Sequence, residues 1–350
     1  QVGEPAQLFT VTWGLWLHYQ QAGQLQTAQG LADEVLALAE GQADPAFQLQ
    51  AHHAAWTTHY RLAEFSACQE HTEQGFALYN IDEHRSHAFL YGGHDPGVCG
   101  RTHEALALWP LGYADQALEQ AHDALALAKR LSHPFSLTLA QLYMALVHQF
   151  RREAELAQER AEATIALCAE QGFAQISAQG AIMRGWAVAA RGQVEMGIAE
   201  MRQGLMSSHP TRAGARRSYF LALLAEAYGH TGQAEEGLSV LAESLDLVEK
   251  TGERTWEAEN HRLKGQLLLV QSAKNAAEAE GCFNQAIDIA RRQLAKSLEL
   301  RAAMSLARLW QAAGKTSEAR ELLAPVYGWF TEGFDTPDLK EAKALLEKST

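Results

Sequence analysis

Small residues recur along this chain about every 40 residues, and this spacing limits the possible folds more than any other feature. The recurring positions are Ala28, Cys68, Ala117, Ala157, Gly197, Gly237, Ala279 and Ala319. The intervals between them are 40, 49, 40, 40, 40, 42 and 40 residues. Self-similarity at a fixed period of this length is typical of repeat proteins, in which each unit packs on its neighbours.

The order of residues within a unit indicates the type of repeat. Ala225 is followed by the aromatic Tyr228, by a turn glycine at Gly232 and by the small residue Gly237. This order is typical of the tetratricopeptide repeat (TPR), whose usual period is about 34 residues. HEAT and armadillo units have periods near 40 residues but a different residue order. We therefore expect TPR-like helix pairs whose helices are longer than usual.

The sequence predicts an all-α fold, a TPR-like α-solenoid that forms one superhelical domain over residues 1–350. Only 8 prolines occur in 350 residues, which suits long helices. Thr336 precedes Pro337 as an N-cap signal, and we expect a capping helix over 337–348 to cover the last apolar face. The eight predicted antiparallel helix pairs span about 5–42, 45–79, 96–131, 134–171, 173–208, 214–250, 253–292 and 295–328.

Charge and cysteine usage restrict the partners. The formal charge is −13 and the isoelectric point about 5.6, so we expect neither a nucleic-acid partner nor a membrane surface, which both favour basic proteins. The closest of the 4 cysteines, Cys68 and Cys99, are 31 residues apart, which indicates reduced thiols and a cytoplasmic protein. Residues 1–4 carry no basic segment typical of a signal peptide, and we expect a piece cut from a longer chain.

The first helix of each pair is expected to line the concave groove of the solenoid. Positions three before, and one and four after, the crossing residue of that helix face inward, and a few neighbours also reach the groove. Aromatic residues there would suit a binding site because they bury much area at low entropic cost. Packing between repeats is the alternative for any one of them. The predicted ligand-binding residues are His53, Tyr60, Trp109, Phe150, Trp186, Tyr219, Glu226, Arg262 and Arg308.

An insert over residues 80–95 accounts for the 49-residue interval. Of the 15 histidines, 11 lie between His52 and His148. One hypothesis is a metal or haem site in the histidine-rich segment 84–103, with His84, His87 and His94 as candidate ligands. Hydrogen-bonding or structural histidines are the favoured interpretation, because no metal-binding motif is complete, and we expect no cofactor.

The apolar run in this insert predicts how the insert packs. A wholly solvated loop rarely keeps three large apolar residues together. We therefore expect Phe89, Leu90 and Tyr91 to fold back onto the array and to hold the histidines near one rim of the groove. A loop on the convex face is the alternative.

A family resemblance rests on the segments 84–92, 95–98, 219–229, 295–303 and 328–339. The chain resembles the C-terminal TPR (MalT-like) region of bacterial signalling proteins that join a class III adenylate/guanylate cyclase domain, a STAND-type AAA ATPase module and a repeat array. The resemblance extends over nearly the whole chain and implies cyclase and ATPase domains of a parent chain as partners. No cyclase or ATPase segment occurs in these residues, so it implies no catalytic activity here.

These observations predict a binding module without catalytic residues. We expect a non-catalytic sensor or scaffold of a bacterial signalling protein that binds a peptide, a protein partner or a small inducer in the concave groove. A metal- or haem-binding protein is the alternative. No nucleophile–base pair or phosphate-binding loop with the required spacing occurs, and we therefore expect no enzyme in this segment.

Overall fold

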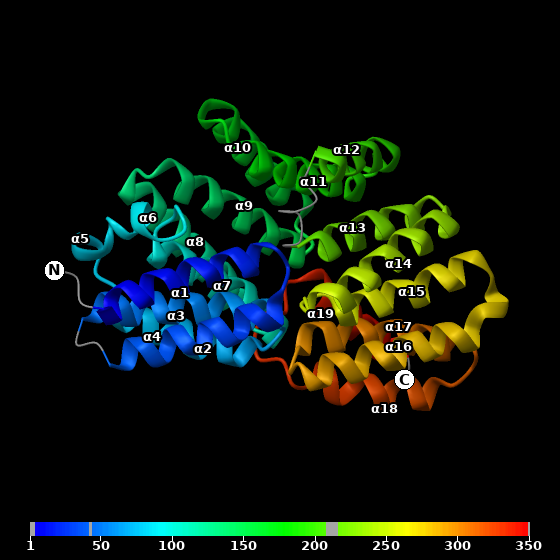
Figure 1. Ribbon diagram of the computed structural model, residues 1–350. Coiled ribbons are helices and arrows are strands. Elements are labelled where there is room, and N and C mark those ends of the chain that lie inside the picture. Colours follow the sequence, from blue (N-terminus) through cyan, green and yellow to red (C-terminus); the bar gives the residue numbers. More distant parts are fainter. Residues whose placement is uncertain (1–3, 42–43, 208–215, 349–350) are drawn as a thin grey trace.

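The computed structural model describes residues 4–41, 44–207 and 216–348, and these residues form helices and no strand. Sixteen of the helices form eight successive antiparallel pairs (Figure 1). The first four pairs are α1 (Glu4–Gln21) with α2 (Leu25–Glu40), α3 (Pro45–Arg61) with α4 (Phe65–Leu78), α7 (Pro96–Leu111) with α8 (Ala114–Leu131), and α9 (Pro134–Phe150) with α10 (Ala154–Gln171).

The second half of the chain continues the same pattern. Its pairs are α11 (Ala174–Ala190) with α12 (Val194–Ser207), α13 (Arg217–His230) with α14 (Ala234–Thr251), α15 (Glu257–Gln271) with α16 (Ala276–Arg292), and α17 (Lys296–Ala312) with α18 (Thr316–Tyr327). A short 3-10 helix, η1 (Ala273–Asn275), precedes α16, and α19 (Pro337–Lys348) follows the last pair. Some of the expected boundaries lie outside the described residues. These are residues 1 and 350, the limits of the single domain, and residues 42, 208 and 214, the limits of three repeats.

The two helices of a pair differ in burial, and this difference shows which of them lies on the inside of the array. Nearly every residue of α7 is buried, whereas α8 buries one stripe that includes Ala117, Ala121 and Ala128. A helix that is buried all round lies in the interior of a fold, and an amphipathic helix covers it. The first helices of the pairs therefore form the inner layer and the second helices form the outer layer.

The recurring small residues allow the helices of a pair to approach closely. All eight of these positions are buried. At the crossing of α11 with α12, a Cβ atom added to Gly197 would lie 2.4 Å from the carbonyl oxygen of Gly185. The 40-residue spacing is therefore the spacing of helix crossings.

The array curls until its two ends meet. In Figure 1 the blue helices α1–α4 lie beside the yellow-to-red helices α15–α19, and the green helices α9–α13 form an arch above them. The contact is direct, since Arg254 N donates to Arg61 O over 2.9 Å and Ser297 Oγ donates to Trp109 O over 2.6 Å. Glu332 accepts hydrogen bonds from the backbone of Asp115 and Gln116 at the start of α8. The second and third pairs thus close against the seventh and eighth.

The insert forms two short helices, α5 (Ile81–His84) and α6 (His87–Leu90), and packs only in part as expected. Tyr91 packs edge-on against Trp13 of α1, with ring centroids 5.1 Å apart. Phe89 and Leu90 remain 80% and 68% exposed, so the expectation that they fold back onto the array is wrong. Residues 87–90 form a single helical turn, and one turn cannot direct three consecutive side chains to the same side.

Candidate ligand-binding pocket

Closure of the array fills the middle of the concave groove with an aromatic wall. This wall consists of Trp109, Phe150, Tyr219 and Trp256. Phe150 contacts Trp109 and Trp256, with ring centroids 5.0 Å and 5.1 Å away, and Tyr219 stacks on Trp256 at 5.1 Å. The guanidinium of Arg301 lies 4.6 Å from the centre of the Trp109 ring. The wall divides the groove into two separate pockets.

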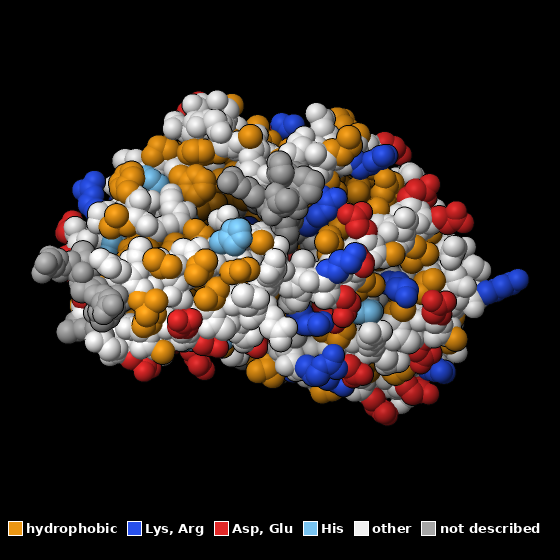
Figure 2. All heavy atoms as spheres, in the orientation of Figure 1, with side chains coloured by type: hydrophobic (Ala, Val, Ile, Leu, Met, Phe, Trp, Pro, Cys, Tyr) orange, Lys and Arg blue, Asp and Glu red, His pale blue; other side chains and the backbone are white. Residues whose placement is uncertain are grey.

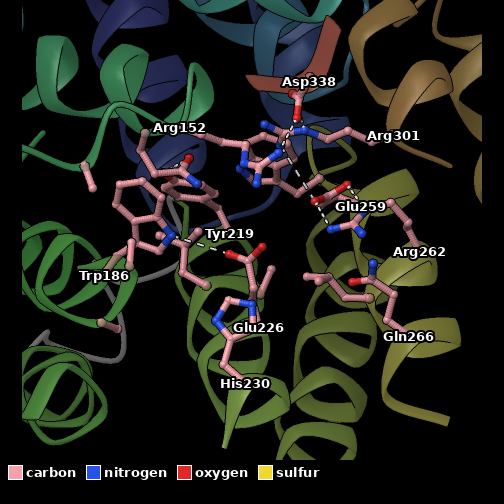
Figure 3. Close-up of a pocket in the computed structure, with 18 of the residues that line it drawn as sticks. Arg152, Trp186, Tyr219, Glu226, His230, Glu259, Arg262, Gln266, Arg301 and Asp338 are labelled. Atoms are coloured by element: carbon pink, nitrogen blue, oxygen red, sulfur yellow. Dashed lines mark hydrogen bonds and ion pairs between the residues drawn. The ribbon is translucent and has the colours of Figure 1, made fainter. Parts of the chain in front are cut away.

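The larger cavity, which we call the inner pocket, has a volume of about 520 Å³. Helices α11, α13, α15, α17 and α19 contribute its walls, and Figure 3 shows side chains from them converging on the cavity. Its size falls within the range of small-molecule sites, about 300–1,000 Å³. Its polar and aromatic lining includes Gln149, Arg152, Trp186, Tyr219, Glu226, His230, Trp256, Glu259, Arg262, Gln266, Arg301, Arg308, Asp338 and Glu341.

The four arginines of the inner pocket are all paired with carboxylates. Arg262 donates two hydrogen bonds to Glu259, at 2.8 Å and 2.6 Å. Arg301 lies 2.8 Å from Asp338 and 3.7 Å from Glu259. Arg152 contacts Asp338 at 3.1 Å and Glu341 at 2.7 Å, and Arg308 contacts Glu341 at 2.7 Å. The pairs formed by Asp338 and Glu341 attach the capping helix α19 to the inner layer.

The pairing keeps the buried carboxylates ionised. Burial alone would raise the pKa of Glu259, but Arg262 and Arg301 beside it lower that pKa below its usual value. Burial likewise opposes ionisation of Asp338, and Arg301 with Arg152 holds its pKa below the usual range. The pocket therefore presents fixed charges of both signs at neutral pH.

Glu226 differs from the other carboxylates of the inner pocket. Its one hydrogen bond within the described chain comes from the indole Nε1 of Trp186, over 3.4 Å, and it forms no ion pair there (Figure 3). Its side chain is half-buried and points into the cavity beside Trp186 and Tyr219. Glu226 feels the charge of Arg262 without forming an ion pair with it, so its half-buried carboxylate is a natural contact for a ligand's positive charge.

Arg152 reaches the inner pocket from a strained turn. In seven of the eight pairs the corner between the two helices has a left-handed residue, which is Ala63 in the second pair and a glycine at Gly23, Gly112, Gly192, Gly232 and Gly314. In the fourth pair this residue is Arg152, with a φ of 60°. A left-handed conformation costs a non-glycine residue roughly 1–2 kcal/mol. Ala63 has the same conformation, so the strain belongs to the repeat corner, and at Arg152 this corner places a side chain that bears two ion pairs.

The second cavity, which we call the histidine pocket, has a volume of about 200 Å³ on the other side of the aromatic wall. Burial lowers the pKa of His94 to about 4 and that of His103 to about 3, so both are neutral imidazoles at pH 7. Arg216 lies over the ring of Tyr143, 4.4 Å from its centroid. The lining includes Trp13, Trp16, His53, Tyr60, His94, Cys99, His103, Tyr143 and Arg216.

The structure distributes the nine predicted binding residues among three places. Trp186, Tyr219, Glu226, Arg262 and Arg308 line the inner pocket. His53 and Tyr60 line the histidine pocket, and Trp109 and Phe150 lie in the aromatic wall between the two. The sequence therefore predicted that these residues face inward, but it did not predict that closure separates them.

Several residues of the inner pocket were missed, and for some of them a signal exists in the sequence. Tyr219 lies six residues before its crossing residue, and Glu259 and Arg301 occupy the same position in the next two pairs. Extending the register to this position would have found them. Asp338 and Glu341 pair with Arg301 and Arg308 of α17, on which the capping helix packs. Closure of the array adds Arg152 to both carboxylates, which the repeat pattern does not encode.

The candidate ligands His84, His87 and His94 do not form one cluster. His84 Nδ1 accepts a hydrogen bond from the backbone N–H of Asn80 over 3.0 Å, and His87 Nδ1 lies 2.8 Å from the amide Nε2 of Gln50. The Nε2 atom of His94 instead lies 3.2 Å from the Nε2 atom of His53.

Comparison with known proteins supports the fold and leaves the family open. No protein-family model matches the chain. The chain is 27% identical over 308 residues to an uncharacterized protein of Rhizobium meliloti (strain 1021). The aligned segment covers 88% of this chain and 30% of that protein. The chain thus spans less than a third of the length of this relative.

Several solved structures have a similar shape. NprR in complex with its cognate peptide NprX has a TM-score of 0.60 at 12% identity, covering 99% of this chain and 98% of that chain. A Rap protein complexed with competence and sporulation factor has a TM-score of 0.58 at 10% identity, covering 98% and 97%.

A STAND protein with a tetratricopeptide repeat sensor from Pyrococcus horikoshii has a TM-score of 0.51 at 11% identity, covering 93% of this chain and 49% of that chain. Identities this low show a common fold alone. The expected fold class, a TPR-like α-solenoid, is confirmed.

Proposed function

We propose that this chain is a non-catalytic sensor module that binds a short peptide with a cationic group in the inner pocket. The observation that carries the proposal is Glu226, a carboxylate without an ion pair in the described chain, set between Trp186 and Tyr219 in a cavity of about 520 Å³. The carboxylate would bind an amine or guanidinium of the peptide, and the two rings would contact an adjoining apolar side chain.

The paired arginines supply a way for binding to change the shape of the array. Arg152, Arg301 and Arg308 hold α19 against the inner layer through Asp338 and Glu341. A peptide that competes for these charges would bind the closed and open arrays with different affinities. A ligand shifts a conformational equilibrium only through such a difference.

The neighbours of similar fold support a peptide as the ligand. The NprR and Rap structures are described as complexes with a cognate peptide and with competence and sporulation factor. Their arrays match almost the full length of this chain. A protein partner or a small inducer also fits the same pocket, provided that it presents a positive charge to the carboxylate of Glu226.

The single-domain organisation over residues 1–350 and the parent-chain partners are further parts of this proposal. The chain spans 30% of its Rhizobium meliloti relative, and a structural neighbour joins a repeat sensor to a STAND ATPase. The array would report peptide binding to ATPase or cyclase domains of a longer chain in the cytoplasm. In the described part of the chain, no helix combines the length and hydrophobicity needed to cross a bilayer.

A thermal-shift experiment with pooled short peptides, sorted by net charge, tests the ligand class. Binding to the folded state raises the melting temperature by mass action. We expect the cationic pools to stabilise the wild-type chain and to lose most of this effect with Glu226→Gln. An equal shift in that variant, or a larger shift with the anionic pools, would overturn the proposal. Glu235→Gln, on the outer helix α14, is the matched control.

A further inference from the structure

The histidine pocket brings together three potential metal ligands from separate parts of the chain. His53 comes from α3, His94 from the insert and Cys99 from the first turn of α7. The ligand atoms of these residues all lie within 4.8 Å of one another, and the two Nε2 atoms are 3.2 Å apart. We propose that His53, His94 and Cys99 bind a divalent transition-metal ion, with Zn²⁺ as the best fit. This site is independent of the inner pocket.

Hydrogen bonding fixes both imidazoles with unprotonated Nε2 atoms. The Nδ1–H of His94 donates to the carbonyl oxygen of Gly92 over 3.0 Å. The Nδ1–H of His53 donates to Oε1 of Gln50 over 3.0 Å, while Nε2 of Gln50 donates to Nδ1 of His87. A neutral imidazole has one N–H, so two lone pairs face each other across 3.2 Å. A cation between these lone pairs and the Cys99 sulfur removes their repulsion.

The spacing of the two imidazoles agrees with tetrahedral coordination. Zinc lies roughly 2.0–2.1 Å from histidine nitrogen and roughly 2.3 Å from cysteine sulfur. Two nitrogen ligands at tetrahedral angles are then about 3.3 Å apart, close to the 3.2 Å between the imidazoles. The two-nitrogen, one-sulfur donor set suits zinc better than Mg²⁺ or Ca²⁺, which prefer oxygen ligands.

The surroundings of the three residues resemble those of metal ligands. Ligating histidines usually donate their second N–H to a carbonyl or carboxylate, and the Gln50 amide oxygen and the Gly92 carbonyl have this role here. The buried indole N–H of Trp56 has no acceptor of normal geometry in the described chain, although it lies near the Cys99 sulfur. A metal-bound thiolate is a stronger acceptor than a thiol and would satisfy this donor.

A water molecule from the pocket can complete the coordination, as at zinc sites with three protein ligands. The ion would tie the insert to α3 and α7 and so fix one rim of the groove.

A metal titration of the purified full chain tests the proposal. The reduced, chelator-stripped protein is titrated with Zn²⁺ against a chromophoric chelator. We expect one equivalent to bind, with affinity about 100-fold lower in His94→Ala and in Cys99→Ser. Gln50→Ala, which removes the outer partner of His53, should lower affinity about tenfold. Co²⁺ should give a thiolate-to-metal absorption band in the wild type and in His94→Ala, but not in Cys99→Ser.

Two variants serve as matched controls. His71→Ala removes the imidazole whose Nδ1 lies 2.9 Å from Nδ1 of His52, another close histidine pair, and Cys168→Ser removes a buried thiol elsewhere. Both should bind Zn²⁺ as the wild type does. The proposal is overturned if the wild type binds less than one equivalent, if His94→Ala binds as tightly as the wild type, or if His71→Ala alone abolishes binding. His94 lies in a loop, so its variant tests the site even if Cys99→Ser fails to fold.

Discussion

At the scale of single residues, the chain keeps buried polar groups whose protonation depends on their neighbours. Burial, with Glu73 of α4 as a nearby negative charge, raises the pKa of Glu104 to about 7, and Arg101 opposes this shift. One carboxylate oxygen of Glu104 is buried without a hydrogen-bond partner in the described chain. Since its ordinary pKa is about 4.3, the folded chain binds more protons than the unfolded chain between about pH 4.5 and 7.

The stability of the chain should therefore fall as pH rises through this window. Glu104→Gln removes the titration, and we expect the variant to be more stable than the wild type by about 1–3 kcal/mol at pH 8. The two proteins should have nearly equal free energies of unfolding at pH 4.5. Urea unfolding at several pH values measures this difference. A difference that does not change with pH would show that Glu104 does not titrate in this range.

Two tryptophans that both belong to the predicted groove should respond differently to substitution. Trp186 lines the inner pocket, whereas Trp109 lies in the aromatic wall beneath Arg301. We expect Trp186→Leu to weaken peptide binding about tenfold, as expected for a residue that contributes more than 1 kcal/mol. Trp109→Leu should instead lower the free energy of unfolding by about 2–4 kcal/mol. Calorimetric binding and urea unfolding of both variants check this, and unchanged affinity in Trp186→Leu would contradict the site.

At the scale of helices, much of the architecture could be predicted from the sequence. The small residues mark helix crossings, and Asp44, Asp95 and His133 cap helices that begin with proline. Such signals are local in sequence, so periodicity and capping rules detect them. The packing of the insert was predicted correctly for Tyr91 and wrongly for Phe89 and Leu90, because no repeat register applies there.

The close crossing of α11 and α12 gives a direct test of the repeat assignment. A Cβ atom at position 197 would meet the Gly185 oxygen at 2.4 Å and the Ala189 Cβ at 2.6 Å. We expect Gly197→Ala to lower the free energy of unfolding by about 1–3 kcal/mol. Gly281→Ala, on the exposed side of α16 with no atom within 4 Å, should stabilise the chain by about 0.5–1 kcal/mol. Thermal unfolding of both variants measures this contrast, and equal effects would contradict the crossing.

At the scale of the whole molecule, contacts between distant repeats determine the candidate site. Asp338 lies 186 positions after Arg152, yet the two side chains form an ion pair. Helix-pair periodicity describes each unit and its neighbour, and closure depends on the small rotation between units summed over the array. The inward-facing residues could therefore be predicted, while their division between two pockets could not.

The ion pairs of Asp338 should contribute to this closure. Asp338→Asn leaves the buried guanidinium of Arg301 without its closest carboxylate, and we expect a loss of about 2–4 kcal/mol in stability. The radius of gyration from small-angle X-ray scattering should also increase as α19 detaches. Asp246→Asn removes an exposed pair with Lys250 and should change stability by less than about 0.5 kcal/mol. An unchanged radius with unchanged stability would show that closure does not depend on these pairs.

The central claim is that the inner pocket is the ligand site, and photo-crosslinking tests it most directly. The tightest-binding cationic peptide is synthesised with a photoreactive side chain, irradiated on the wild-type chain, and its attachment points are mapped by mass spectrometry. The account predicts attachment at residues that line the inner pocket, such as Trp186, Tyr219, Gln266 and Met304, with little attachment in Glu226→Gln. Attachment on the outer helices or on the insert, at equal yield in both proteins, would contradict it.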